Sequence, residues 1–125
     1  MNVYASAEDY LEAILSLKLR LGNVRSVDIA NELNFSKPSV SVAMKKLREN
    51  GYVEVDQDGY IQLLPAGDEI AQRVYERHHL LTDLFIRIGV DPEVAAADAC
   101  KVEHDLSVET FQKIKEFALE QSSKA

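Results

Sequence analysis

Residues 27–63, VDIANELNFSKPSVSVAMKKLRENGYVEVDQDGYIQL, decide the fold of this chain. Their pattern predicts two short helices, a turn between them, and a hairpin of two strands. The first helix, over 27–33, has one apolar face, and its small Ala30 allows another helix to cross closely over it. Asn34 and Phe35 form the turn that follows.

The second helix is expected from Ser36 to about Asn50. Ser36 supplies a side-chain oxygen for the free amides of the first turn, and Pro38 stands where a missing N–H costs nothing. Apolar residues recur at i, i+4 and i+7 and face the core, namely Val40, Met44 and Leu47. The side chains left pointing largely outward are basic or carry hydroxyls: Lys37, Ser39, Ser41, Lys45, Lys46 and Arg48.

A hairpin follows this helix. Gly51 ends the helix, 52–55 alternates like a strand, and 60–63 returns. The pair Asp58-Gly59 is typical of a two-residue type I′ turn. The whole stretch therefore predicts a winged helix-turn-helix, in which the hairpin is the wing.

The outward face of the second helix combines phosphate-type donors with short hydroxyls that can reach base edges. We predict that it meets DNA through Lys37, Ser39, Ser41, Lys45 and Lys46, with Gln57 at the wing tip 57–59 on the flanking backbone. Winged helices also serve as protein–protein modules, and a helix with several lysines is often only a solvated face. Both alternatives stay open on these residues alone.

The chain has 125 residues, enough for a small domain with a helical appendage. It has no apolar run of membrane-spanning length, no signal segment and one cysteine, so we expect a cytoplasmic protein with no membrane partner and no disulfide framework. The net charge of −7 is uneven, because 1–64 carries 7 basic and 9 acidic residues and 65–125 carries 7 and 12. This split favours a DNA-binding domain at 1–64 and a second domain at 65–125 whose carboxylates have another role.

The first helix of the chain is expected over 6–21, with Ser6 as its N-cap. Its apolar stripe is Tyr10, Ala13, Ile14, Leu17 and Leu21. Asp9 and Glu12, at i and i+3, project together from a side off this stripe. A capping box with Ser6 would explain Asp9, and a solvated charge would explain Glu12, so each gains interest only with partners.

Pro65 opens a helix that continues to Gly89. Its apolar stripe is Ile70, Val74, Leu81, Phe85 and Ile88. His78 falls on this stripe, where a lone histidine is more often a satisfied core residue than a ligand. The neighbouring His79 is expected to be exposed.

The next helix, 92–105, is capped by Asp91 and ends with Cys100, Glu103 and His104 at i, i+3 and i+4. A thiolate, a carboxylate and an imidazole from one helical turn have the spacing of metal ligands. A buried cysteine beside a surface Glu-His pair is the alternative. Ser107 caps a last helix to about Gln121, whose apolar face adds Phe111, Ile114, Phe117 and Ala118 to surface that self-association would cover.

Taken together, these motifs resemble the diphtheria-toxin-repressor family of metal-dependent transcriptional regulators, and within it the short manganese-responsive branch (MntR type). The resemblance covers nearly the whole chain and rests on 8–12 (EDYLE), the winged helix, Arg77-His78 and 103–107 (EHDLS). It implies a mainly α protein in which a winged helix-turn-helix DNA-binding domain precedes a helical metal-binding and dimerisation domain. The metal ligands of that branch match Asp9, Glu12, His78, Glu103 and His104.

Two residues depart from this pattern. Cys100 stands where the manganese branch has glutamate, whereas the iron branch has cysteine there but usually methionine in place of Asp9. Val42 stands where an iron-type recognition helix has glutamine. We therefore expect Cys100 to join the ligand set and Fe²⁺ or Mn²⁺ to be the activator, with Zn²⁺ or Co²⁺ able to bind in vitro.

The resemblance implies a homodimeric repressor that binds a palindromic DNA operator when loaded with a divalent metal and controls genes of metal homeostasis. The alternative is a metal-independent winged-helix regulator or interaction module. No nucleophile elbow or phosphate-binding loop occurs in the sequence, and we expect no enzyme.

Overall fold

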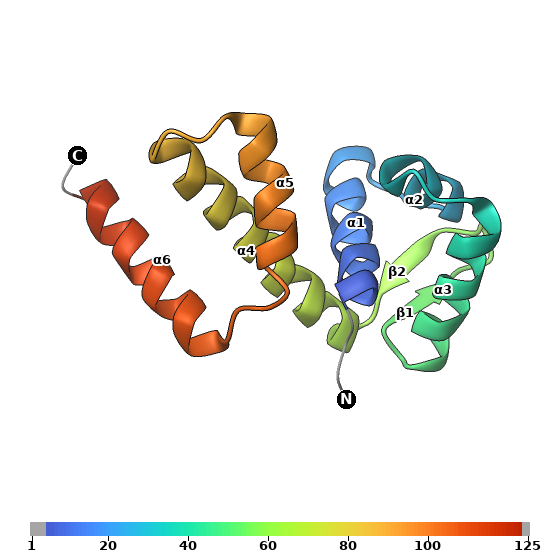
Figure 1. The fold of residues 1–125 in the computed structure, drawn as a ribbon. Helices are drawn as coiled ribbons and strands as arrows, with labels where there is room; N and C mark the ends of the chain where they lie inside the picture. The colour runs from blue at the N-terminus through green and yellow to red at the C-terminus, as the bar shows by residue number, and fades with distance from the viewer. Residues whose placement is uncertain (1–4, 124–125) are drawn as a thin grey trace. The chain divides into compact units, whose positions relative to one another are not determined.

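The computed structural model describes residues 5–123. These residues form six helices and one two-stranded sheet, and the chain divides into two compact units, Met1–Tyr75 and Glu76–Ala125. The predicted fold class, mainly α with a winged helix-turn-helix first, is confirmed (Figure 1). The domain boundary after residue 64 stays a prediction, and its outer ends, 1–4 and 124–125, lie outside the described residues.

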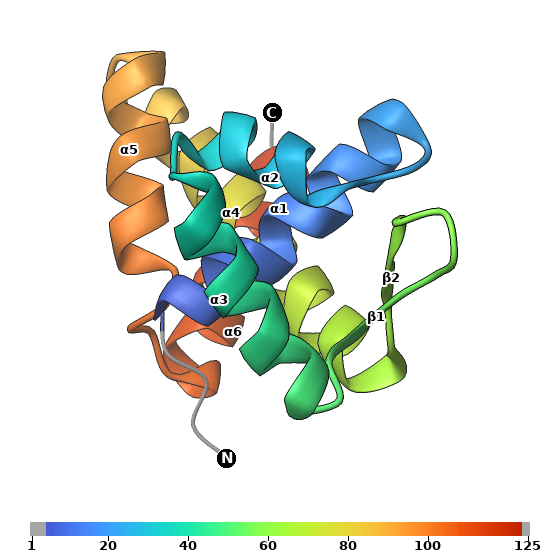
Figure 2. The same ribbon diagram turned by 90° about the vertical axis from the view of Figure 1, so that its right-hand side faces the viewer.

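The first unit contains the helix-turn-helix and its wing. Figure 2 shows α3 crossing the face turned to the viewer, with the hairpin beside it. The elements in chain order are α1 (Ala5–Leu21), α2 (Ser26–Leu33), α3 (Lys37–Glu49), β1 (Val53–Val55), β2 (Ile61–Leu63) and the start of α4 (Pro65–Arg87).

The turn between α2 and α3 is built by short polar residues, as the sequence indicates. Asn34 ends α2 in the left-handed conformation, with φ of 57°, which asparagine tolerates better than most residues. Ser36 caps α3, since its Oγ accepts a hydrogen bond of 3.3 Å from the amide of Ser39. Val40, Met44 and Leu47 are buried, so the predicted facing of α3 is confirmed.

The wing pairs β1 with β2 antiparallel, with Val53 opposite Leu63 and Val55 opposite Ile61. The predicted type I′ turn is wrong. Such a turn needs positive φ at both central residues, whereas only Gly59 of the pair Asp58-Gly59 has it, at 83°. The loop instead closes through the amide of Gly59 on the carbonyl of Asp56, 3.1 Å away. The Asp56 carboxylate also accepts from the amides of Asp58 and Tyr60, and this local bonding favours the longer loop.

The core of the first unit surrounds α1. Leu11 and Ile14 of α1 have no exposed surface, and burial of each contributes about 1.5–3 kcal/mol. They pack in one cluster with side chains of the other elements, including Val24, Ile29, Val40, Ile61 and Ala71. Helix α1 begins at Ala5, so Ser6 lies in its first turn and is not the predicted N-cap, and Leu21 is exposed.

The second unit contains the remainder of α4, followed by α5 (Pro92–Val102) and α6 (Val108–Ser123). The predicted caps are confirmed: Asp91 accepts from the amides of Glu93 and Val94, and Ser107 accepts from that of Thr110. Helix α5 is three residues shorter than expected, which leaves Glu103 and His104 in the turn after it. Ile88 lies on a stripe that was expected to be buried and is 72% exposed, whereas Phe117, on the face that self-association was expected to cover, is 55% exposed.

No helix of the described residues is long and apolar enough to cross a lipid bilayer.

Gly67, in the first turn of α4, lies against the backbone of Tyr52. A Cβ at Gly67 would overlap the carbonyl oxygen of Tyr52 and lie 2.9 Å from its carbon. This carbonyl is fixed, because it accepts from the amide of Leu64 at 2.9 Å. We expect Gly67→Ala to lower the free energy of unfolding by about 1–3 kcal/mol, as overpacking does, measured by urea unfolding followed by circular dichroism.

The exposed neighbour Ala66 provides the control, since Ala66→Gly changes helix propensity alone, by at most about 1 kcal/mol. A Gly→Ala change at an unobstructed helical site stabilises. A stabilised Gly67→Ala variant would therefore contradict the close approach.

Candidate metal centre and nucleic-acid interface

Three potential ligands converge in the second unit. His78 of α4, Cys100 of α5 and Glu103 just after α5 each offer one ligand atom, and these atoms lie within 4.8 Å of one another. Nδ1 of His78 is 2.9 Å from Oε2 of Glu103. The sequence predicted the spacing of Cys100 and Glu103, and the structure adds His78 from a different helix.

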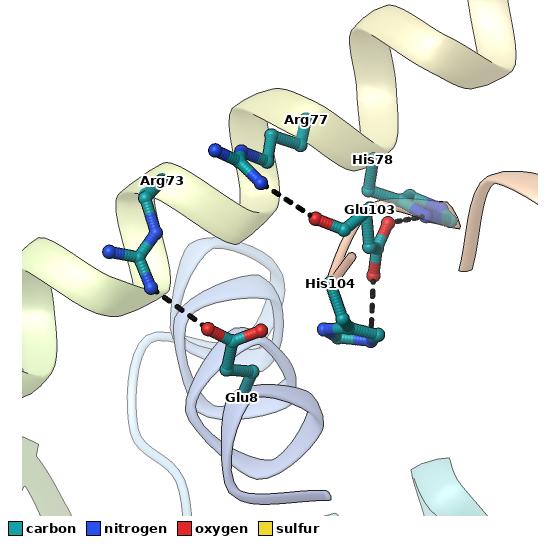
Figure 3. A network of polar contacts seen from close by, with 6 residues as sticks. All are labelled: Glu8, Arg73, Arg77, His78, Glu103 and His104. Carbon is teal, nitrogen blue, oxygen red and sulfur yellow. Dashed lines mark hydrogen bonds and ion pairs between the residues drawn. The ribbon is translucent and has the colours of Figure 1, made fainter. Parts of the chain in front are cut away.

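Glu103 is the centre of this cluster and has no exposed surface. Figure 3 shows its two carboxylate oxygens directed at two imidazoles, with His78 on Oε2 and His104 on Oε1 at 3.5 Å. A buried carboxylate is costly unless positive charge or donors face it. Here two imidazole nitrogens face the carboxylate oxygens, at 2.9 Å and 3.5 Å, and a divalent cation at this place would supply the positive charge. The N, O and S donors fit a first-row divalent metal.

Arg77 holds the turn that carries Glu103 and His104. Its Nη1 donates to the carbonyl of Glu103 at 3.0 Å and to that of Leu106 at 2.8 Å, and its guanidinium lies 5.1 Å from the ring centre of Phe111. The Arg77 side chain is buried. Figure 3 shows its bond to Glu103. Sequence reasoning missed this role, although an arginine at i+3 from Val74 and i−4 from Leu81 was a charge on an apolar stripe.

Cys100 is exposed, so the alternative of a buried cysteine is wrong. His79 is exposed as expected, and its ring meets that of His78 edge on, 5.5 Å between centres. Partial desolvation lowers the pKa of His79, the charge of His78 lowers it further, and Glu103 acts in the opposite direction. His79 is not among the clustered ligands of the described residues.

The candidate ligands of α1 belong to the first unit. Asp9 and Glu12 are half-buried and follow each other at i, i+3. Their neighbour Glu8 is buried and bonds to Nη2 of Arg73 at 2.8 Å, which ties α1 to the start of α4 within this unit (Figure 3). A structural role for Glu8 is thus visible, and the ligand role of Asp9 and Glu12 stays a prediction.

The candidate DNA contacts are all exposed: Lys37, Ser39, Ser41, Lys45 and Lys46 on α3, and Gln57 in the wing. The Ser39 hydroxyl accepts from that of Ser36 at 2.8 Å, so it is already used in capping. Basic side chains that sequence reasoning left out lie beside the wing, since Lys18 donates to Gln62 and Arg25 stacks over Tyr60. The sequence signal that could have found these two residues was their position on either side of the turn that follows α1.

A winged helix-turn-helix joined to a helical unit with a buried His–Glu–His contact and an adjacent thiol defines a class of protein, the winged-helix regulators with a ligand-binding helical part. The chain belongs to the iron dependent repressor family. Residues 2–61 match the model of its N-terminal DNA binding domain, and 64–121 match that of its metal binding and dimerisation domain.

Relatives agree with this assignment. The transcriptional regulator MntR of Salmonella typhimurium is 33% identical over 118 residues, which are 94% of this chain and 75% of that protein. The HTH-type transcriptional regulator MntR of Listeria monocytogenes is 37% identical over 109 residues, 87% of this chain and 77% of that protein. The crystal structure of T. acidophilum IdeR superposes with a TM-score of 0.77 at 31% identity and covers 93% of this chain. The chain spans about half, 54%, of that IdeR chain.

Arg77 provides a test of how the turn is held. We expect Arg77→Met to lower the free energy of unfolding by about 2–3 kcal/mol, because one buried and one partly buried carbonyl lose a charged donor. Arg87→Met, later in the same helix, is the matched control: its partner Asp83 is 64% exposed and its own side chain is 39% exposed, so about 0–1 kcal/mol is expected. Equal losses of unfolding free energy in the two variants, measured in urea, would show that Arg77 does not stabilise the turn more than an exposed ion pair does.

Proposed function

We propose that this protein is a homodimeric transcriptional repressor that binds a palindromic DNA operator when activated by a divalent metal and controls genes of metal homeostasis. The observation that carries the proposal is the convergence of His78, Cys100 and Glu103 within a unit that matches a metal-binding and dimerisation domain. The DNA side is supported by the exposed basic face of α3 in the unit that matches a DNA-binding domain.

The proposed ligand set is that of the resemblance plus the thiol: Asp9, Glu12, His78, Cys100, Glu103 and His104. Carboxylates suit Mn²⁺, imidazoles suit borderline ions, and a thiolate shifts preference along the series from Mn²⁺ toward Fe²⁺ and Zn²⁺. Fe²⁺ is our first choice of activator and Mn²⁺ the second. Zn²⁺ and Co²⁺ are able to bind in vitro, although Zn²⁺ prefers four-coordinate closure that uses only part of the set.

When bound, the metal supplies positive charge. In the ligand set that the resemblance implies, Asp9, Glu12 and Glu103 would respond to it, because three carboxylates held in one site repel each other until they are neutralised. A metal held by ligands of α1 and of the second unit would then fix the DNA-binding units of the dimer at one separation. A palindrome requires recognition helices about 34 Å apart, or a multiple of this distance. Such a regulator meets its operator in the cytoplasm, our proposed location.

Metal dependence is tested on Glu103. In an anaerobic gel shift on an operator selected in vitro, we expect DNA binding with Fe²⁺ or Mn²⁺ and its loss in chelator. Glu103→Gln removes the charge of the central ligand but keeps its shape, and should lower metal affinity by about 10–100-fold or more. Glu93→Gln, an exposed change in the first turn of α5, is the control and should leave the metal response unchanged.

Binding that is equally strong in chelator and in metal would contradict the proposal. It would favour a metal-independent winged-helix regulator.

We expect Cys100 to determine the order in which divalent metals activate DNA binding. Cys100→Glu gives an all-oxygen and imidazole site, and should raise the response to Mn²⁺ relative to Fe²⁺ in anaerobic titrations with Mn²⁺, Fe²⁺, Co²⁺ and Zn²⁺. Ala97→Glu adds the same charge to an exposed position of α5 and controls for charge alone. An unchanged order of metals in Cys100→Glu would show that the thiol is not a ligand.

A further inference from the structure

One apolar side chain stands on the outward face of α3. Val42 is 57% exposed, while Val40 and Met44, two residues to either side, are almost fully buried. Two residues along a helix correspond to about 200°, so Val42 points away from the core. Val42 is therefore a methyl-bearing side chain in the middle of α3, on the face of the helix that points away from the core.

The surroundings of Val42 are polar and basic. Ser41 precedes it, and Lys45 and Lys46 follow at i+3 and i+4, all of them exposed. An isolated exposed valine on a protein surface is ordinary. This one lies on the helix of a DNA-binding domain that enters the major groove, and the flanking cations are complementary to phosphate.

The distribution of charge along α3 indicates which part of the helix contacts DNA. The basic side chains of α3 are Lys37 in its first turn and Lys45, Lys46 and Arg48 in its second half, and all are exposed. Phosphate contacts on both sides of the middle turn would place that turn over the groove. Val42 is within this part, and it has no donor or acceptor with which to read a base edge.

The major groove offers one apolar feature, the 5-methyl group of thymine. We propose that Val42 is a specificity-determining residue that contacts a thymine methyl group in each half of the operator. This inference rests on the proposed DNA-binding function and deepens it. Lysines around Val42 supply affinity without sequence preference, and the valine methyls supply discrimination by excluding water from the thymine methyl.

Uracil provides a direct test, because it differs from thymine only in lacking that methyl group and keeps every hydrogen-bonding atom. The metal-loaded protein first selects its half-site from a random duplex library. Each thymine of the selected site is then replaced by uracil in both halves. We expect one position per half-site at which the replacement in both halves weakens binding by about 16-fold, that is, about fourfold for each of the two buried methyl groups.

The protein side of the test is Val42→Ala. This variant should bind the thymine duplex more weakly but show no further loss with uracil at the sensitive position, as a double-mutant cycle measures. Its salt dependence should equal that of the wild type. Lys45→Ala is the matched control on the same face: it should reduce the salt slope and keep the uracil effect, because it removes a phosphate contact.

A second variant tests the assignment by gain of function. Val42→Gln presents an amide that pairs with N6 and N7 of adenine, so selection should change the preferred base at the sensitive position from thymine to adenine. Alanine and glutamine are good helix formers, and thermal melting should match that of the wild type.

The outcomes separate the two proposals. If the metal-loaded protein retains no duplex in the selection, the proposed function fails and this inference with it. If it selects a site whose thymines tolerate uracil, or if Val42→Ala keeps the full uracil effect, the inference alone is overturned.

Discussion

The contact between Glu103 and two imidazoles is the interaction on which the helical unit depends. A fully buried carboxylate is tolerated only with positive charge beside it, and here Nδ1 of His78 at 2.9 Å and Nε2 of His104 at 3.5 Å are the groups available. Arg77 holds the same turn, because it donates hydrogen bonds to the carbonyls of Glu103 and Leu106. A site that is charged and buried in this way has a reason to bind a cation, because the cation would bring positive charge to the buried carboxylate.

The winged helix was predictable because its signals are local. They lie within one helix and are all present in the structure: the cap Ser36, Pro38 in the first turn, and the buried Val40, Met44 and Leu47. The signal that was missed in the wing turn is also local. The prediction used only the dipeptide Asp58-Gly59 and left out Asp56, whose carboxylate accepts hydrogen bonds from amides of the loop.

The candidate site was predictable only in part, because it joins residues distant in sequence. The spacing of Cys100 and Glu103 is local, but nothing in the chain near 78 shows that Nδ1 of His78 meets Glu103. The role of Arg77 is also tertiary: its partners are backbone carbonyls 26 and 29 residues away, which carry no sequence signal. The exposure of Ile88 and Phe117 likewise depends on what covers them, which periodicity does not specify.

The two parts of the chain use charge in opposite ways. In the first unit, lysines of α3 stay in water, where each can exchange a counterion for phosphate at little cost. In the second, Glu103 is removed from water, so its charge interacts strongly and selectively with what lies beside it. An exposed thiol at Cys100 adds a soft donor to that buried, hard one. Under the proposed function, the ligands of the second unit therefore contribute to discrimination among cations. On the DNA side, the lysines would contribute attraction that does not depend on base sequence and leave discrimination to the few side chains between them.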